Sequence, residues 1–241
     1  MFELLPMLMV STLVAGIVQG ISGFAFAIIF LAMMQPFLPY TDLLSLSSIL
    51  CVIMLAANAY RYRKYIVWKW IPIPVIINFI FTMGAIYVLN GALDFPYWHK
   101  LLGVVFILLA GYLYFFQDRI QIKPTLLNAI IFCGAGGILG GLFGVGGTPV
   151  VLYFLAVADS KEHYIGTGQM FFFFNMVYDF IGRILSGMVT VATLQNALLS
   201  VPTILIGLWI GAKLFARIDV KALKKIVYFL MFLDGCYMML T

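Results

Sequence analysis

The sequence predicts an all-α integral membrane protein with two inverted repeats, each a glycine-broken re-entrant helical hairpin plus three transmembrane helices. Three observations predict this fold: an apolar composition, two apolar segments too long for one crossing, and a match between the two halves of the chain. Of the 241 residues, 64% are hydrophobic and 10% are charged, and the mean hydropathy is +1.11. A globular domain is about half apolar and about a quarter charged, so the composition excludes a water-soluble fold and indicates a lipid bilayer as partner.

Eight apolar segments account for most of the chain, and a spanning helix needs roughly 20 such residues. They are 4–38, 42–60, 71–90, 98–116, 125–158, 163–188, 195–213 and 221–240. The start of the chain has neither a basic stretch nor a cleavage pattern, so we expect the first segment to stay in the membrane. The net charge of +5 is explained by membrane topology, and we expect no nucleic-acid partner.

Segments 4–38 and 125–158 are too long to cross once, because a helix rises about 1.5 Å per residue and the hydrocarbon core is about 30 Å thick. Both contain glycines near the middle, where a helix breaks most easily. Arms of about 15 residues would reach about 22 Å. We therefore expect each segment to fold back as a hairpin whose tip stops inside the membrane.

The two glycine-containing segments match at a constant offset of 121 residues, about half the chain. The aligned glycines are Gly16, Gly20 and Gly23 in the first half and Gly137, Gly141 and Gly144 in the second. Weaker matches follow in the same order, among them Asn58 with Asn175 and Gly84-Ala85 with Gly211-Ala212. Their shared order indicates duplication, with residues 1–120 as the first membrane repeat and 121–241 as the second, together one functional domain.

The distribution of Lys and Arg favours the hairpins. If both long segments crossed once, the loop charges would divide six against seven, whereas hairpins place twelve on one face and Lys100 alone on the other. Basic loops collect on the cytoplasmic side. The twelve are Arg61, Arg63, Lys64, Lys69, Arg119, Lys123, Lys161, Lys213, Arg217, Lys221, Lys224 and Lys225. The halves then have opposite orientations, and we expect a multi-pass protein of the cell membrane with both termini outside.

The turn of the second hairpin is the sharpest candidate site. Gly144, Gly146 and Gly147 let the backbone approach a ligand closely, and Thr148 followed by Pro149 predicts an N-cap and the first helical residue. The unpaired N–H groups and partial positive charge of a helix N-terminus favour an anion. Alternatively, the glycines serve only close helix packing, as in a membrane scaffold or assembly protein.

Further substrate-binding candidates are polar residues within apolar segments. Gln19, Ser22 and Gly23 lie at the first turn, Asn58 and Asn175 occupy equivalent places after each hairpin, and Gln169 has no equivalent. A buried amide in lipid needs a partner, which a substrate would supply. An interhelical hydrogen bond is the alternative for the two asparagines.

Asp179 and Arg183 lie four residues apart within an apolar segment, on one helical face. Charge at that depth is costly and marks functional candidates. The two side chains are expected to form an ion pair, or Arg183 faces an anionic substrate while Asp179 takes part in proton coupling. The segments offer no nucleophile with a base, so we expect no enzyme, and no metal site or cofactor is predicted. The sequence leaves homo-oligomer formation open.

The run Gly140-Gly141-Leu142-Phe143-Gly144-Val145-Gly146-Gly147-Thr148-Pro149, with the eight apolar segments and the half-length repeat, resembles the TauE/SafE family of sulfite and organosulfonate permeases. The likeness extends over essentially the whole chain. It implies transport of small anions such as sulfite, thiosulfate, organosulfonates or short carboxylates. In that reading one half rocks against the other, by alternating access, around a midplane site between the two hairpin tips.

Overall fold

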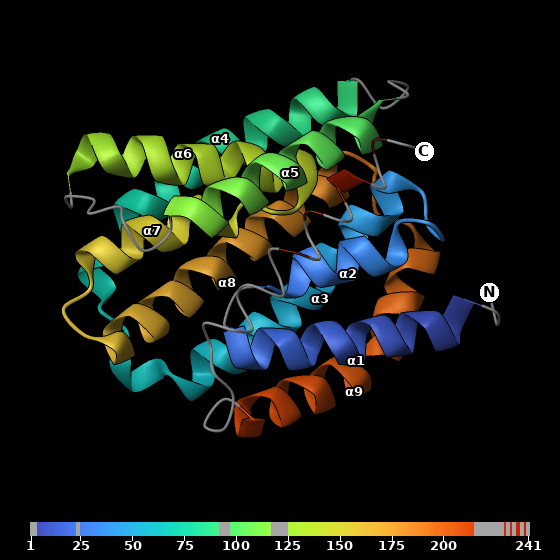
Figure 1. Ribbon diagram of the computed structural model, residues 1–241, viewed down its shortest axis with the longest axis horizontal. Helices are drawn as coiled ribbons and strands as arrows, with labels where there is room; N and C mark the ends of the chain where they lie inside the picture. Colours follow the sequence, from blue (N-terminus) through green and yellow to red (C-terminus); the bar gives the residue numbers. More distant parts are fainter. Residues whose placement is uncertain are drawn as a thin grey trace. The chain divides into compact units, whose positions relative to one another are not determined.

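A computed structural model describes residues 4–22, 25–91, 97–116 and 125–214, together with residues 229, 232, 235, 236 and 239. Every regular element in these residues is helical, as predicted. The elements are α1 (Leu4–Ser22), α2 (Phe26–Met34), α3 (Tyr40–Arg61), η1 (Arg63–Tyr65), η2 (Trp68–Trp70), α4 (Pro72–Gly91), α5 (Trp98–Phe116), α6 (Leu126–Phe143), α7 (Gly147–Val157), α8 (Lys161–Leu185) and α9 (Val191–Leu214) (Figure 1). Most of the predicted segment 221–240 lies outside the described residues.

Within the described residues, four helical stretches are long and apolar enough to cross a bilayer. They are Tyr40–Arg61, Trp68–Gly91, Leu126–Phe143 and Val191–Leu214. The predicted segment 163–188 forms α8, which is not among them. Its first turn contains a charged residue, Glu162, and Asp179 and Arg183 follow further along, so α8 depends on neighbouring helices to accommodate its charges.

Both long apolar segments are interrupted. In the second, α6 ends at Gly144, whose φ of 73° lies in the left-handed region that favours glycine. The chain then enters α7, which packs back against α6. In the first, α1 and α2 also pack against each other, and the Phe26 N–H donates to Gln19 Oε1 (2.9 Å) across the break. The depth of these hairpins in a bilayer stays a prediction.

The arms of the hairpins are unequal, which corrects the expected arms of about 15 residues. The first arms, α1 and α6, have 19 and 18 residues, and the second arms, α2 and α7, have 9 and 11. An 18-residue helix is about 27 Å long, close to the thickness of the hydrocarbon core. The difference arises because α1 and α6 continue slightly past the middle of their segments, to Ser22 and Phe143, and because α2 ends at Met34, before the end of its segment.

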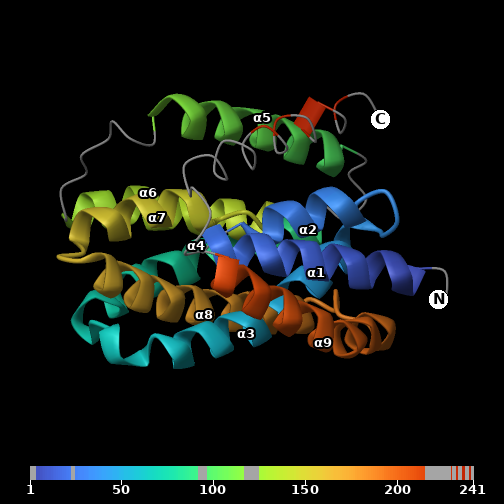
Figure 2. The ribbon, with the colours of Figure 1, turned by 60° about the horizontal axis from the view of Figure 1, so that its bottom comes forward.

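The chain divides into two compact units, and each takes helices from both halves of the sequence. Unit 1 is Met1–Ser47, Asp94–Arg119 and Val191–Thr241, and unit 2 is Ser48–Leu93 and Ile120–Thr190. Within unit 1, α1 packs along α9, and within unit 2, α6 packs along α4. Each pair lies side by side in both views (Figure 1 and Figure 2).

Glycines bring the backbones of α1 and α9 into contact in unit 1. A side-chain carbon added at Gly16 would lie 2.9 Å from the Ile204 carbonyl oxygen, and one added at Gly20 would lie 2.7 Å from that of Leu208. No neighbouring side chain could move aside, because the obstacle is backbone. Small residues allow this close approach of helices in lipid.

The same register recurs between α6 and α4 in unit 2. A carbon added at Gly137 would lie 2.7 Å from the Asn78 carbonyl oxygen, and one added at Gly141 would lie 2.8 Å from that of Thr82. These glycines follow Gly16 and Gly20 by 121 residues, and the carbonyls precede those of unit 1 by 126 residues. The sequence match of Gly84-Ala85 with Gly211-Ala212 has an offset of 127 residues. This offset is therefore one residue larger than the offset of 126 that relates the carbonyls in contact.

Three helices of unit 2 run in the same direction and begin at the same end. The contacts that show this are Asn78 with Cys133, Thr82 with Gly137, Asn78 with Asn175, and Met83 with Gly182. Because α7 runs back along α6, it ends where α4, α6 and α8 begin. We call this the basic end of unit 2, since Arg61, Arg63, Lys64 and Lys69 lie in the segment that leads into α4.

Candidate functional site

The glycines of the second hairpin differ in what they do. The Gly144 N–H donates to the Gly140 carbonyl oxygen (2.8 Å), so α6 itself uses this predicted donor. A carbon added at Gly146 would lie 2.0 Å from the Gly136 carbonyl oxygen, so only glycine lets the two arms approach this closely. A carbon added at Gly147 would meet only the Phe172 ring, at 3.7 Å.

The first turn of α7 starts earlier than predicted. The helix begins at Gly147 with Gly146 as its N-cap, so the expected N-cap at Thr148 is wrong, and the Thr148 side chain lies outside the described part of the structure. The N-cap residue, Gly146, makes no side-chain cap to this turn, whereas Gln19 accepts from the first amide of α2. The start of α7 therefore retains backbone N–H groups that favour an anion.

The predicted ion pair between Asp179 and Arg183 is confirmed, and it lies against the hairpin. Arg183 Nε donates to Asp179 Oδ2 (2.8 Å) and Nη2 donates to Oδ1 (3.0 Å). Nη2 also donates to the carbonyl oxygens of Gly141 (3.1 Å) and Gly140 (3.3 Å). Both carbonyls belong to the last turn of α6. Helix geometry leaves acceptors unused there, although the Gly140 oxygen also accepts from Gly144. Arg183 therefore caps the first arm from α8.

One nitrogen of Arg183 has no hydrogen-bond partner among the described residues. The residue is 0% exposed, yet Nη1 makes no hydrogen bond. A buried donor without a partner is costly, and more so when it is charged. Gly140 also contacts the start of α7, since a carbon added there would lie 3.7 Å from Gly146 Cα. The guanidinium and the first turn of α7 thus adjoin the same residue, and both favour negative charge.

The structure gives the predicted amides separate protein partners. Asn58 Nδ2 donates to Gln169 Oε1 (3.2 Å), which joins α3 to α8. Asn175 Nδ2 donates to Asn78 Oδ1 and to Tyr178 Oη. All of these lie in unit 2, and the contacts match the alternative of interhelical hydrogen bonds.

Three polar residues that bond to Asn175 or to its partners were not among the sequence candidates: Asn78, Thr82 and Tyr178. Asn78 Oδ1 accepts from Asn175, Tyr178 and Thr82, and Asn78 Nδ2 donates to the Cys133 carbonyl oxygen (2.7 Å). The available signal was an amide and a hydroxyl four residues apart inside the apolar segment 71–90. These bonds tie α4, α6 and α8 together beneath the hairpin tip.

The first-hairpin candidates belong to unit 1. Gln19 is buried and spans the break through Phe26. Ser22 ends α1, but its side chain lies outside the described residues, as does Gly23 entirely.

Comparison with known proteins gives the family. The family model described as sulfite exporter TauE/SafE matches residues 8–238, nearly the whole chain. No curated protein and no solved structure shows a significant match. The resemblance read from the glycine run is therefore confirmed, and the family and the apolar helices indicate a multi-pass membrane protein with a small-molecule substrate. The family consists of transporters and not enzymes. This chain belongs to that family, the sulfite exporter family TauE/SafE.

Proposed function

We propose that this protein is a secondary permease for small anions, such as sulfite, thiosulfate, organosulfonates or short carboxylates. The observation that carries the proposal is the buried Arg183 beside the glycine hairpin, whose Nη1 has no partner in the part of the chain that the structure describes. An oxyanion supplies the charge-assisted acceptor that this nitrogen lacks. The first turn of α7, whose N-cap residue has no side chain, supplies further donors.

Asp179 sets the charge balance of this site. It neutralises Arg183 through two hydrogen bonds, so an anion at Nη1 leaves the buried group with one excess negative charge. Buried net charge is unfavourable in a membrane segment. A proton taken up by Asp179 restores neutrality, and we propose that anion and proton move together.

Alternating access would use both hairpins, with the substrate at midplane between the two tips. The shared glycine register of α1 with α9 and α6 with α4 supports two equivalent halves, as inverted-repeat transporters have. In this proposal the two compact units, each with helices from both halves of the chain, are the bodies that move. Basic loops on the cytoplasmic side and termini outside belong to the same proposal.

Flux in proteoliposomes tests the proposal. Purified protein is reconstituted, and uptake of sulfite, thiosulfate, an alkanesulfonate and acetate is followed with and without a pH gradient. We expect saturable flux of at least one of these anions, accompanied by proton movement. Absence of flux for all of them, with correctly folded protein in the vesicles, rejects the anion permease.

A further inference from the structure

A cavity of about 350 Å³ lies at the basic end of unit 2, away from the hairpin tip. Its lining comes from η2, the first turn of α4, the end of α7 and the loop before α8. The volume lies within the range of small-molecule sites, about 300–1,000 Å³. α7 runs from the proposed anion site to this cavity, so the two sites lie at opposite ends of that helix.

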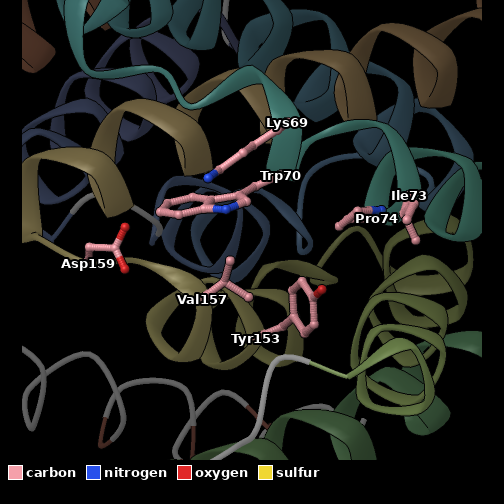
Figure 3. Close-up of a pocket in the computed structure, with 7 residues that line it drawn as sticks. All are labelled: Lys69, Trp70, Ile73, Pro74, Tyr153, Val157 and Asp159. Carbon is pink, nitrogen blue, oxygen red and sulfur yellow. The ribbon is translucent and has the colours of Figure 1, made fainter.

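The cavity presents two opposite charges that are not paired with each other. Figure 3 shows the Lys69 ammonium turned toward the Trp70 ring, and its Nζ lies 5.8 Å from the ring centroid. Asp159 enters from the loop that follows α7. Among the described residues, neither charge forms a salt bridge. One cation and one anion on the same cavity match a zwitterion, because each binds one end of the guest.

Aromatic rings also line the cavity. Trp70 and Tyr153 line the cavity, and His163 packs edge-on against Trp70 with 6.3 Å between ring centroids. Tryptophan and tyrosine favour the headgroup level of a membrane, where one side is apolar and the other is wet. A cavity of this composition at the ends of several apolar helices is suited to a lipid headgroup.

An apolar stripe leads away from the cavity along α4. Ile73 lines the cavity and is 54% exposed, and Ile76 and Ile80 continue its face at 58% and 60%. Residues spaced by three and four share one helical face. An acyl chain can lie on this stripe while the headgroup fills the cavity, which favours a lipid over a free solute.

We propose that this cavity binds the headgroup of a phospholipid that carries a primary amine, of the phosphatidylethanolamine type. Lys69 binds the phosphate, and Asp159 accepts hydrogen bonds from the ammonium. The indole of Trp70 and the ring of Tyr153 pack against the ethylene link. A quaternary headgroup lacks the N–H groups that Asp159 needs, and a glycerol headgroup lacks the positive charge.

Lipid binding to the detergent-purified full chain tests the proposal by native mass spectrometry. The probes are phosphatidylethanolamine, phosphatidylcholine and phosphatidylglycerol with identical acyl chains. We expect phosphatidylethanolamine to be retained about fivefold more than either of the others, the size of one charge contact at a membrane surface. Asp159→Asn should abolish this preference, whereas Lys69→Gln, which removes the contact to the phosphate that all three lipids share, should lower the retention of all three.

Matched controls are Lys64→Gln and Glu162→Gln, which remove exposed charges at the same end that do not line the cavity. These variants should keep the preference. Equal retention of the three lipids, or loss of preference in the controls, overturns the proposal. Displacement of the lipid by equimolar soluble phosphoethanolamine also overturns it, since the guest would then be a free zwitterion. The readout is lipid retention and not flux, so its failure leaves the anion permease untouched.

Discussion

At the scale of single residues, Arg183 has two kinds of neighbour. Its Nε and Nη2 donate to Asp179 and to the carbonyls of Gly140 and Gly141. These contacts are structural, because they tie α8 to the hairpin. Nη1 has no such task. A guanidinium has five donors in a rigid fork, so one side chain can hold the hairpin and still offer donors to an anion.

Removing both charges together separates the two tasks. Arg183→Gln alone leaves Asp179 buried and uncompensated, which destabilises by about 3–5 kcal/mol. The double variant Asp179→Asn, Arg183→Gln leaves no buried charge, so we expect unfolding temperatures much closer to wild type but no anion flux. Thermal unfolding and proteoliposome uptake are measured on the same preparations. Flux retained by the folded double variant would show that Arg183 is only a cap.

The charge balance predicts a further effect of Asp179→Asn alone. Arg183 then keeps a net positive charge without a proton partner. We expect anion binding to persist, or to become tighter, while proton movement accompanying flux is lost. Binding is followed by thermal shift with sulfite, and proton movement by an internal pH dye. Proton movement unchanged in this variant contradicts the assigned role of Asp179.

Gly146 and Gly147 allow the effect of helix packing to be measured separately from the effect of ligand approach. Gly146→Ala places a carbon 2.0 Å from the Gly136 carbonyl, so we expect lower thermal stability and loss of flux together. Gly147→Ala meets only the Phe172 ring at 3.7 Å, so stability should change by less than about 0.5 kcal/mol while anion flux falls. Normal flux in Gly147→Ala would favour glycines that serve only packing.

At the scale of elements, each of two long helix pairs depends on glycines in the same register. Backbone lies against backbone between α1 and α9 and between α4 and α6. In lipid the gain comes from van der Waals contact and not from removal of apolar surface from water. These interfaces therefore tolerate added volume poorly.

Alanine substitutions measure this dependence in each unit. Gly20→Ala in α1 and Gly141→Ala in α6 place a carbon 2.7 Å from Leu208 O and from Ala85 Cβ, respectively. We expect each to destabilise by about 1–3 kcal/mol, the usual effect of overpacking. The controls, Gly111→Ala and Gly84→Ala, meet nothing within 4 Å and should be neutral or stabilising. Equal effects in tests and controls would contradict the packing register. Thermal unfolding in lipid nanodiscs provides the measurement.

At the scale of the whole molecule, charge and connectivity predict the orientation of the chain. Lys64 lies beside the basic end of unit 2, and Lys100 lies in the first turn of α5. The positive-inside rule places the basic loops in the cytoplasm. Single cysteines at positions 64, 100 and 162, in a background that lacks the native cysteines, should react with an impermeant thiol reagent from the cytoplasmic, the outer and the cytoplasmic face, respectively. Reaction at 64 and 162 from opposite faces would contradict the hairpin topology, because a single crossing by segment 125–158 would separate these two positions.

Residue-level candidates were only partly accessible from the sequence. A four-residue spacing on one face predicted the ion pair of Asp179 with Arg183, because that spacing is local. The partners of Asn58 and Asn175 were not predicted, since they are 111 and 97 residues distant along the chain. The predicted N-cap failed because α7 begins at Gly147, next to the contact of Gly146 with Gly136, and that tertiary contact leaves no local signal beside Thr148.

By itself the sequence determined an all-helical membrane protein, the interruption of its two longest apolar segments and membership of the TauE/SafE family. Composition, segment length and glycine runs are local properties, and lipid requires each segment to satisfy its own backbone. Only the tertiary structure decided that α1 pairs with α9 and α6 with α4 across the halves of the chain. Apolar segments of similar hydropathy carry little information about which faces meet. That choice depends on backbone approach at particular glycines, and it placed the unpartnered nitrogen of Arg183 beside the hairpin.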